Sequence, residues 1–183
     1  MSPLAVNRSS RSAVAIVPPQ SVWEPINAIR QKHDKQFTRW MPHINLIFPF
    51  VHPDRLEEER ERLAEASAVV GPWEVTFATF RYFKHSSNRA SLWLDPEPRA
   101  PLEDLYAALV AQFPHLDTSL RFEAGFTPHL SVGQTRTLVL GRHLADALNE
   151  TWQPVTFTAD ALTVLRRTST DPFEVAYRVN LTG

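Results

Sequence analysis

Apolar and polar residues along the chain follow two periods, one typical of strands and one typical of helices. The segments predicted to be strands are 12–17, 40–50, 73–85, 91–94, 126–133, 155–167 and 173–181. Apolar residues three and four positions apart predict helices between them, most clearly over Leu102–Phe113. The predicted order is therefore strand, helix, strand, helix, hairpin, followed by helix, strand, helix, hairpin.

Short stretches of similar sequence support an internal repeat. Trp73–Ala78 resembles Trp152–Thr158, and each stretch lies just before a predicted hairpin. A duplicated chain of this kind predicts an α+β fold with two lobes, in which two small antiparallel sheets face a central groove and helices cover the outside. We expect residues 1–11 to be a flexible tail and residues 12–183 a single domain, with the boundary between lobes near residues 95–101.

One strand in each half carries a histidine followed two positions later by a small polar residue. The first is His43 with Asn45, and the second is His129 with Ser131. Because alternate side chains of a strand share a face, both polar residues of a motif point the same way. A single motif of this form is common and more often structural. Two copies in matched Pro-His contexts favour a functional pair that lines one groove.

The paired motifs resemble those of the 2H phosphoesterase superfamily, which includes 2′-5′ RNA ligases and cyclic phosphodiesterases. The resemblance covers nearly the whole chain, from about Val14 to Leu181. It implies metal-independent cleavage or transfer at a phosphodiester of RNA or a nucleotide, typically a 2′,3′-cyclic phosphate or a 2′-5′ linkage, without a cofactor. Asn45 departs from the usual serine or threonine, and Gln134 stands where some members carry an arginine.

The residue types suggest how such a site would act. Histidine titrates near neutral pH, so one of His43 and His129 could accept a proton from water or a hydroxyl. The other could give a proton to the leaving ribose oxygen. Asn45 and Ser131 could hold the non-bridging phosphate oxygens. Which histidine is the acid stays open at this point.

Weaker candidates for substrate binding surround these motifs. The repeat aligns Trp93 with Arg178, so Trp93 could stack on a base and Arg178 could pair with a phosphate. The simpler alternative makes Trp93 a core residue and Arg178 a surface residue. Strand ends near the groove give the remaining candidates: Tyr82, Lys84, His85 and Arg39.

Composition narrows the alternatives. A net charge of −1 gives no overall attraction to polyanions, and the chain has no cysteine for a thiolate site. No apolar run is long enough to cross a bilayer, and no protein partner is indicated, so we expect a cytoplasmic protein. The motifs lack the acidic ligands of a metallohydrolase, and no phosphate-binding loop of the P-loop type occurs. The main rival hypothesis is an RNA- or nucleotide-binding module of the same fold without catalysis.

Overall fold

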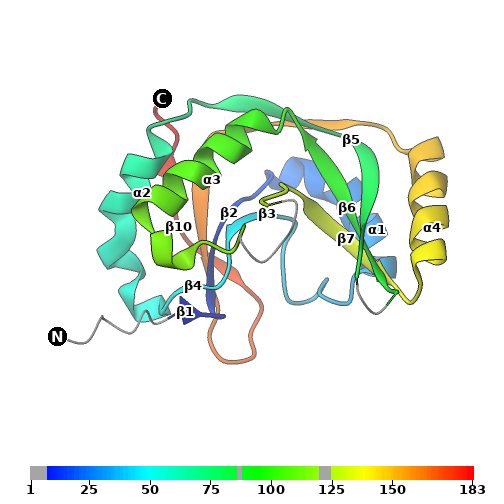
Figure 1. Ribbon diagram of the computed structural model, residues 1–183, viewed down its shortest axis with the longest axis horizontal. Helices are drawn as coiled ribbons and strands as arrows, with labels where there is room; N and C mark the ends of the chain where they lie inside the picture. The colour runs from blue at the N-terminus through cyan, green and yellow to red at the C-terminus, as the bar shows by residue number, and fades with distance from the viewer. Residues whose placement is uncertain (1–7, 86–87, 120–124) are drawn as a thin grey trace.

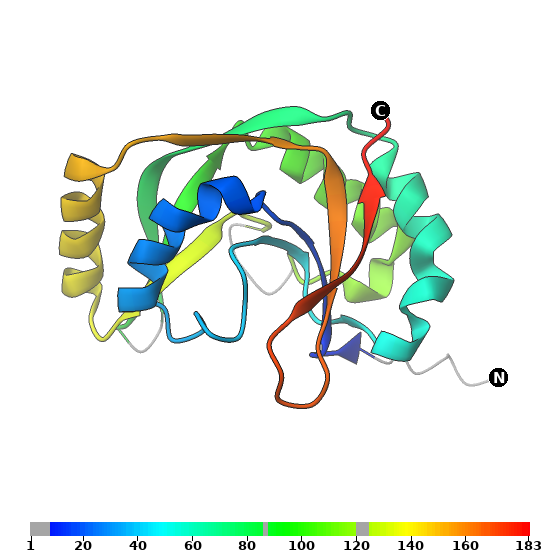
Figure 2. The ribbon, with the colours of Figure 1, turned by 180° about the vertical axis from the view of Figure 1, so that it is seen from behind.

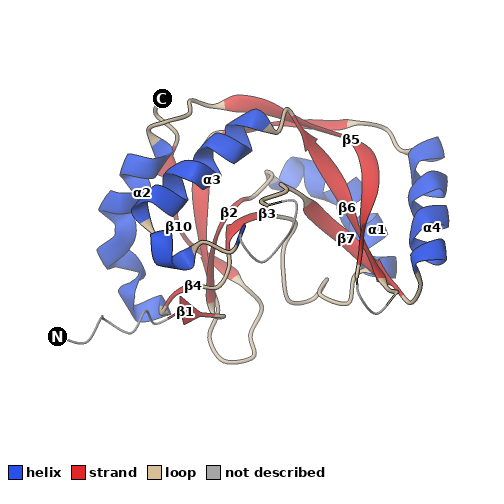
Figure 3. Ribbon diagram, in the orientation of Figure 1, coloured by secondary structure: helices blue, strands red, loops and turns tan. Residues whose placement is uncertain are grey.

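The computed structural model describes residues 8–85, 88–119 and 125–183 (Figure 1). Figure 3 shows strands in the middle of the molecule with helices at both sides. The strands are β1 (Arg8–Ser9), β2 (Ser12–Ile16), β3 (Ile44–Ile47), β4 (Phe50–Val51), β5 (Trp73–Lys84), β6 (Ala90–Glu97), β7 (Leu130–Thr135), β8 (Val155–Ala159), β9 (Ala161–Arg166) and β10 (Glu174–Asn180). The α-helices are α1 (Trp23–His33), α2 (Arg60–Ser67), α3 (Ala100–Gln112) and α4 (Leu138–Thr151). Short 3-10 helices cover Gln20–Val22, Pro53–Glu59 and Pro114–Leu116.

Local sequence explains these elements. The long strand β5 is rich in aromatic and β-branched residues, which suit an extended backbone. At the start of α4, the Thr137 side chain accepts a hydrogen bond from the Leu140 amide, a typical N-cap. No helix among the described residues is long and apolar enough to span a membrane.

Two antiparallel sheets form the centre of the fold, each with four strands in the described part of the chain. The first, called here the β3 sheet, has the order β10-β9-β2-β3, and the second, the β7 sheet, has the order β7-β6-β5-β8. Strands β3 and β7, which follow the two motif histidines, are both edge strands, and they contact each other. Helices α2 and α3 cover the β3 sheet, while α1 and α4 pack on the β7 sheet (Figure 1). The predicted α+β class with two antiparallel sheets is confirmed.

The lobes are not sequential halves of the chain, contrary to the predicted boundary at residues 95–101. The β3 sheet takes β9 and β10 from the C-terminal end, while the β7 sheet takes β5 and β6 from the first half. The segment expected to be one hairpin arm, 155–167, is divided at Asp160: β8 pairs with β5, and β9 pairs with β2. The described chain therefore crosses between the two sheets twice, after β3 and between β8 and β9.

The segment 95–101 also differs from the linker that its prolines suggested. Asp95 lies in β6, is 1% exposed, and forms ion pairs with Arg81 and Arg99. Burial by itself would raise the pKa of Asp95, but the hydrogen bonds from Arg99 and Arg81 outweigh it and lower the pKa. At the other end of the chain, Arg8–Ser9 pair with Phe50–Val51, so part of the predicted tail is a strand.

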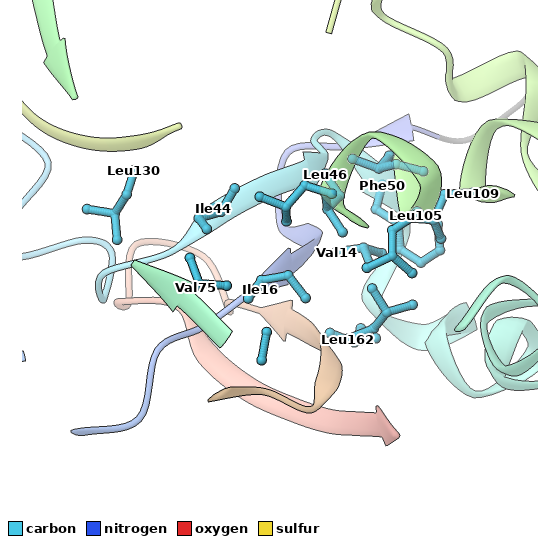
Figure 4. Packing of buried hydrophobic residues seen from close by; sticks show 14 of the residues in the cluster. Val14, Ile16, Ile44, Leu46, Phe50, Val75, Leu105, Leu109, Leu130 and Leu162 are labelled. Carbon is cyan, nitrogen blue, oxygen red and sulfur yellow. The ribbon is translucent and has the colours of Figure 1, made fainter. Parts of the chain in front are cut away.

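A continuous apolar core joins the sheets and orients the motifs. Ile44 and Leu46 of β3, and Leu130 and Val132 of β7, are at most 3% exposed and belong to one cluster of buried side chains. Figure 4 shows Ile44, Leu46 and Leu130 among the residues packed in this core. Because side chains alternate along a strand, burying these residues turns the polar motif residues to the opposite face.

Helix α1 approaches β7 closely at Gly133. A Cβ atom built on Gly133 would lie 2.6 Å from the His33 Cβ and 3.0 Å from the His33 carbonyl oxygen. A glycine at this position lets the end of α1, and the loop that follows it, lie against the strand that bears Ser131.

We therefore expect Gly133→Ala to destabilise the protein, because the extra methyl group must displace the helix end. The free energy of unfolding should fall by about 1–3 kcal/mol, the usual cost of overpacking. Urea unfolding followed by circular dichroism measures this loss. An unchanged unfolding midpoint and slope would show that α1 does not pack on β7 this tightly.

Candidate active site

The two motif histidines are held by the same local hydrogen bond. His43 Nδ1 lies 2.7 Å from the Met41 carbonyl oxygen, and His129 Nδ1 lies 2.7 Å from the Thr127 carbonyl oxygen. A carbonyl can only accept, so each Nδ1 must carry the hydrogen. In the neutral ring Nε2 then has a free lone pair, and neither Nε2 has a hydrogen-bond partner among the described residues. Both imidazoles are thus fixed in the tautomer that offers Nε2 to a ligand.

Burial disfavours the charged form of both rings. For His43, desolvation lowers the pKa from 6.5 to about 4, and the positive charges of Arg30 and His129 act in the same direction against the hydrogen bond to Met41. Burial also lowers the pKa of His129, partly offset by the hydrogen bond to Thr127. Without a ligand, both histidines are therefore neutral at pH 7.

An aromatic stack supports His43. Its ring lies on Trp40 with centroids 4.5 Å apart, and Trp40 in turn stacks on Phe173 with centroids 3.6 Å apart. The edge of Phe48 meets the Trp40 ring. Trp40 and Phe173 are 8% and 4% exposed, so the stack excludes water from one side of His43. The stack therefore contributes to the desolvation of that imidazole.

Two other aromatic rings hold His129. Phe83 and Trp93 stack on each other, and both present edge-to-face contacts to the His129 ring, with centroids 5.0 and 5.9 Å away. Trp93 is the cross-strand partner of Ser131, so these two side chains lie side by side on one face of the sheet.

One pocket of about 290 Å³ collects residues from both motif strands. Its lining comprises Arg30, Asp34, Gln36, Arg39, Trp40, His43, Asn45, Phe48, Ser131 and Gln134. Asn45 lines this pocket, and its Oδ1 is buried without a hydrogen-bond partner among the described residues. His43 and Asn45 thus share one cavity with Ser131, while His129 lies two residues before Ser131, just ahead of β7.

Gln134 ties the loop after α1 to β7. Its Nε2 donates to Asp34 Oδ1 at 3.0 Å, and its Oε1 accepts from the Lys35 amide at 3.0 Å. Asp34 also pairs with the buried Arg30, whose guanidinium donates to the Trp40 carbonyl oxygen at 2.8 Å. Gln134 therefore holds the loop after α1 against β7. The guanidinium group next to the first motif is that of Arg30, which belongs to α1.

Several predicted substrate-binding residues lie elsewhere. Trp93 is 4% exposed and covered by Phe83 and His129, so it is not available to stack on a base. Arg178, on the edge strand β10, pairs with Asp160 at 2.5 Å and lines a separate pocket of about 560 Å³. Trp93 differs from its prediction because it packs in the core, and Arg178 differs because it forms a local ion pair.

The predicted basic wall on β5 is also on the wrong face. Tyr82 and Lys84 alternate with Phe83, which is the residue that contacts His129, so their side chains point away from it. The His85 ring bonds to the Ser91 hydroxyl at 2.8 Å, at the end of the hairpin. Of the weaker candidates, Arg39 lies in the pocket with His43.

Sequence reasoning missed Arg30, Asp34, Phe48, Phe83 and Phe173. They come from a helix, three loops and a strand, and local sequence patterns do not indicate how these elements pack. The alternation of residues along β5 could have favoured Phe83, but only with the strand register known. Among the described residues, no cluster of three His, Cys, Asp or Glu side chains is placed to hold a metal ion.

Comparison with known proteins confirms the resemblance. Residues 18–171 match the model of the 2′-5′ RNA ligase superfamily. The chain therefore belongs to this family of phosphoesterases. A Staphylococcus haemolyticus protein named "Putative phosphoesterase SH1944" is 25% identical over 125 residues, which are 68% of this chain and 70% of that protein.

Solved structures share the fold. The protein TT0787 of Thermus thermophilus has a TM-score of 0.63 at 14% identity, over 94% of this chain and 98% of that one. The Escherichia coli LigT structure complexed with 3′-AMP has a TM-score of 0.58 at 18% identity, over 97% of this chain and 100% of that one. At these identities the likeness establishes the fold alone.

Proposed function

We propose that the protein is a metal-independent phosphodiesterase that acts on a 2′,3′-cyclic phosphate or 2′-5′ phosphodiester of RNA or a nucleotide. The observation that carries the proposal is the matched presentation of two imidazoles, each with Nδ1–H bound to a backbone carbonyl and Nε2 left free. Family membership supports phosphoester chemistry. Two free Nε2 atoms on contacting strands suit a reaction that needs one proton acceptor and one proton donor.

His43 is best suited to be the base in the hydrolytic direction. Its pKa of about 4 keeps it neutral, and therefore able to accept a proton, over most of the pH range. An anionic phosphate bound between the rings favours the imidazolium form, so it raises the pKa of His129 and prepares that residue as the acid.

The proposed steps move two protons. A water oxygen attacks phosphorus while His43 takes one of its hydrogens, and a new phosphorus–oxygen bond forms. The bond to one ribose oxygen breaks, and that oxygen receives the proton from His129. Asn45 Nδ2 and the Ser131 hydroxyl donate to non-bridging oxygens as negative charge builds on them. The protein is regenerated when the two imidazoles exchange protons with solvent.

We expect His43→Ala and His129→Ala each to lower kcat/KM for a nucleoside 2′,3′-cyclic phosphate by ~10²–10⁴, because each removes one proton transfer. Chromatography that separates the 2′- and 3′-phosphate products measures the rate and the bond that is broken. His143→Ala, which alters an exposed histidine on α4, is the matched control and should leave turnover unchanged.

Excess chelator should have no effect on the wild-type rate. Circular dichroism must show that the variants remain folded. Full activity in either motif variant would contradict the two-histidine mechanism. Tight binding of the cyclic phosphate by wild type without any turnover would favour the rival hypothesis of a binding module.

The pH dependence follows from the two pKa shifts. His43 must be neutral, which holds above about 4, and His129 must be protonated, which holds below a pKa that lies under 6.5. The value of kcat/KM reports the free enzyme, so it should reach its maximum on the acid side of neutrality and fall above it. A profile that keeps rising to pH 8 would mean that His129 is not the acid.

A further inference from the structure

Two arginines that have no acidic partner within the described part of the chain stand at the outer end of the aromatic stack. Arg39 lies in the loop between α1 and β3, and Arg167 lies in the loop between β9 and β10. Their guanidinium carbons are 5.7 and 5.6 Å from the centre of the Phe173 ring. Neither forms an ion pair with a carboxylate among the described residues, and the Nε of each is buried without a partner. Arg167 Nη2 donates to the Ser169 carbonyl oxygen at 2.6 Å, which orients the guanidinium without neutralising its charge.

The two loops are joined, so the arginines are held near each other. The Phe173 amide donates to the Arg39 carbonyl oxygen at 2.9 Å, and the Arg167 amide donates to the Arg11 carbonyl oxygen at 2.9 Å. Figure 2 shows the loop that ends in Phe173 (orange to red) hanging beside the loop that leads into β3 (light blue). The pKa of Arg39 is lowered by burial and by the positive charge of Arg167.

Two positive charges held near each other without a counter-ion raise the free energy of the folded protein. An anion bound between them removes this repulsion and accepts hydrogen bonds from both guanidinium groups. Other arginines nearby are already paired: Arg166 bonds to Glu174 at 2.9 Å, and Arg30 bonds to Asp34. Arg39 also lines the same pocket as His43, while Phe173 and Trp40 lie between the arginines and that histidine. An anion held here therefore lies on the far side of Phe173 and Trp40 from the His43 ring, and Arg39 borders both this position and the pocket that holds His43.

We propose that Arg39 and Arg167 form a second anion subsite, which takes the 5′-phosphate of the nucleotide whose 2′- or 3′-phosphate lies between the histidines. The inference rests on the proposed function and narrows the range of substrates that the protein would prefer. The preferred substrate is then a 5′-phosphorylated nucleotide or an RNA end, in which the next phosphate along the strand occupies this subsite. A nucleoside cyclic phosphate without a 5′-phosphate would leave the subsite empty.

Equilibrium binding tests the subsite without requiring turnover. Isothermal titration calorimetry should compare adenosine 3′,5′-bisphosphate with adenosine 3′-monophosphate, with the 2′-phosphate isomers in parallel. Wild type should bind the bisphosphate on the order of tenfold more tightly, as expected for a charge-assisted contact. The affinity for the bisphosphate should also fall more steeply with salt, because one more phosphate is neutralised.

Arg167→Gln should reduce the ratio of the two affinities to near one, and Arg39→Gln should reduce it likewise. Arg166→Gln makes the same change at the adjacent, ion-paired residue, so it should keep the wild-type ratio. A wild type with no preference for the bisphosphate, or an Arg167→Gln variant that keeps the preference, would overturn the proposal. Because binding is measured directly, a failure of wild type to hydrolyse cyclic phosphates would count against the proposed function alone.

Discussion

The contact between the two edge strands β3 and β7 is the constraint on which the rest of the structure depends. An edge strand normally exposes unpaired backbone groups and invites association. Here the two edges meet each other, and their apolar side chains, including Ile44 and Leu130, enter one shared core. Burying those residues fixes the strands face to face and leaves the alternate positions for the polar motifs. The groove is thus a consequence of core packing, and it needs no separate structural element.

The chemistry of the site depends on how the histidines are desolvated. Aromatic rings lie against each imidazole, Trp40 on His43 and Phe83 with Trp93 on His129. These contacts orient the two imidazoles, and they lower the pKa of each because they exclude water from its charged form. In the proposed mechanism both imidazoles are neutral until an anion binds, and the bound anion raises their pKa so that one can protonate a leaving group. The second pair of cations, Arg39 and Arg167, would add selectivity through a phosphate that does not react.

The class of fold and most helices and strands could be predicted from the sequence, because each depends on local periodicity. The matched motifs also indicated that the two strands that follow them meet. Local periodicity could not predict which hairpin joins which sheet: β9 and β10 pair into the β3 sheet, and β5 and β6 belong to the β7 sheet. Nothing in segment 155–167 indicates that the chain leaves one sheet at Asp160 and enters the other. For the same reason Trp93 and Arg178 are not at their predicted places, since the repeat aligns their strands but not their surroundings. Asp34 and Gln134, one hundred positions apart in the sequence, meet only because Gly133 allows α1 to approach β7.

The central claim is that His43 and His129 act together on one phosphate. Nuclear magnetic resonance of the Cε1–Hε1 groups tests it most directly, with pH titrations of the free protein and of the protein saturated with adenosine 3′-monophosphate. The account predicts a His43 pKa near 4 and a His129 pKa below 6.5 in the free protein. Both resonances should respond over the same range of nucleotide concentration, and both pKa values should rise. A response from only one histidine, or a His43 that titrates normally in the free protein, would contradict the account.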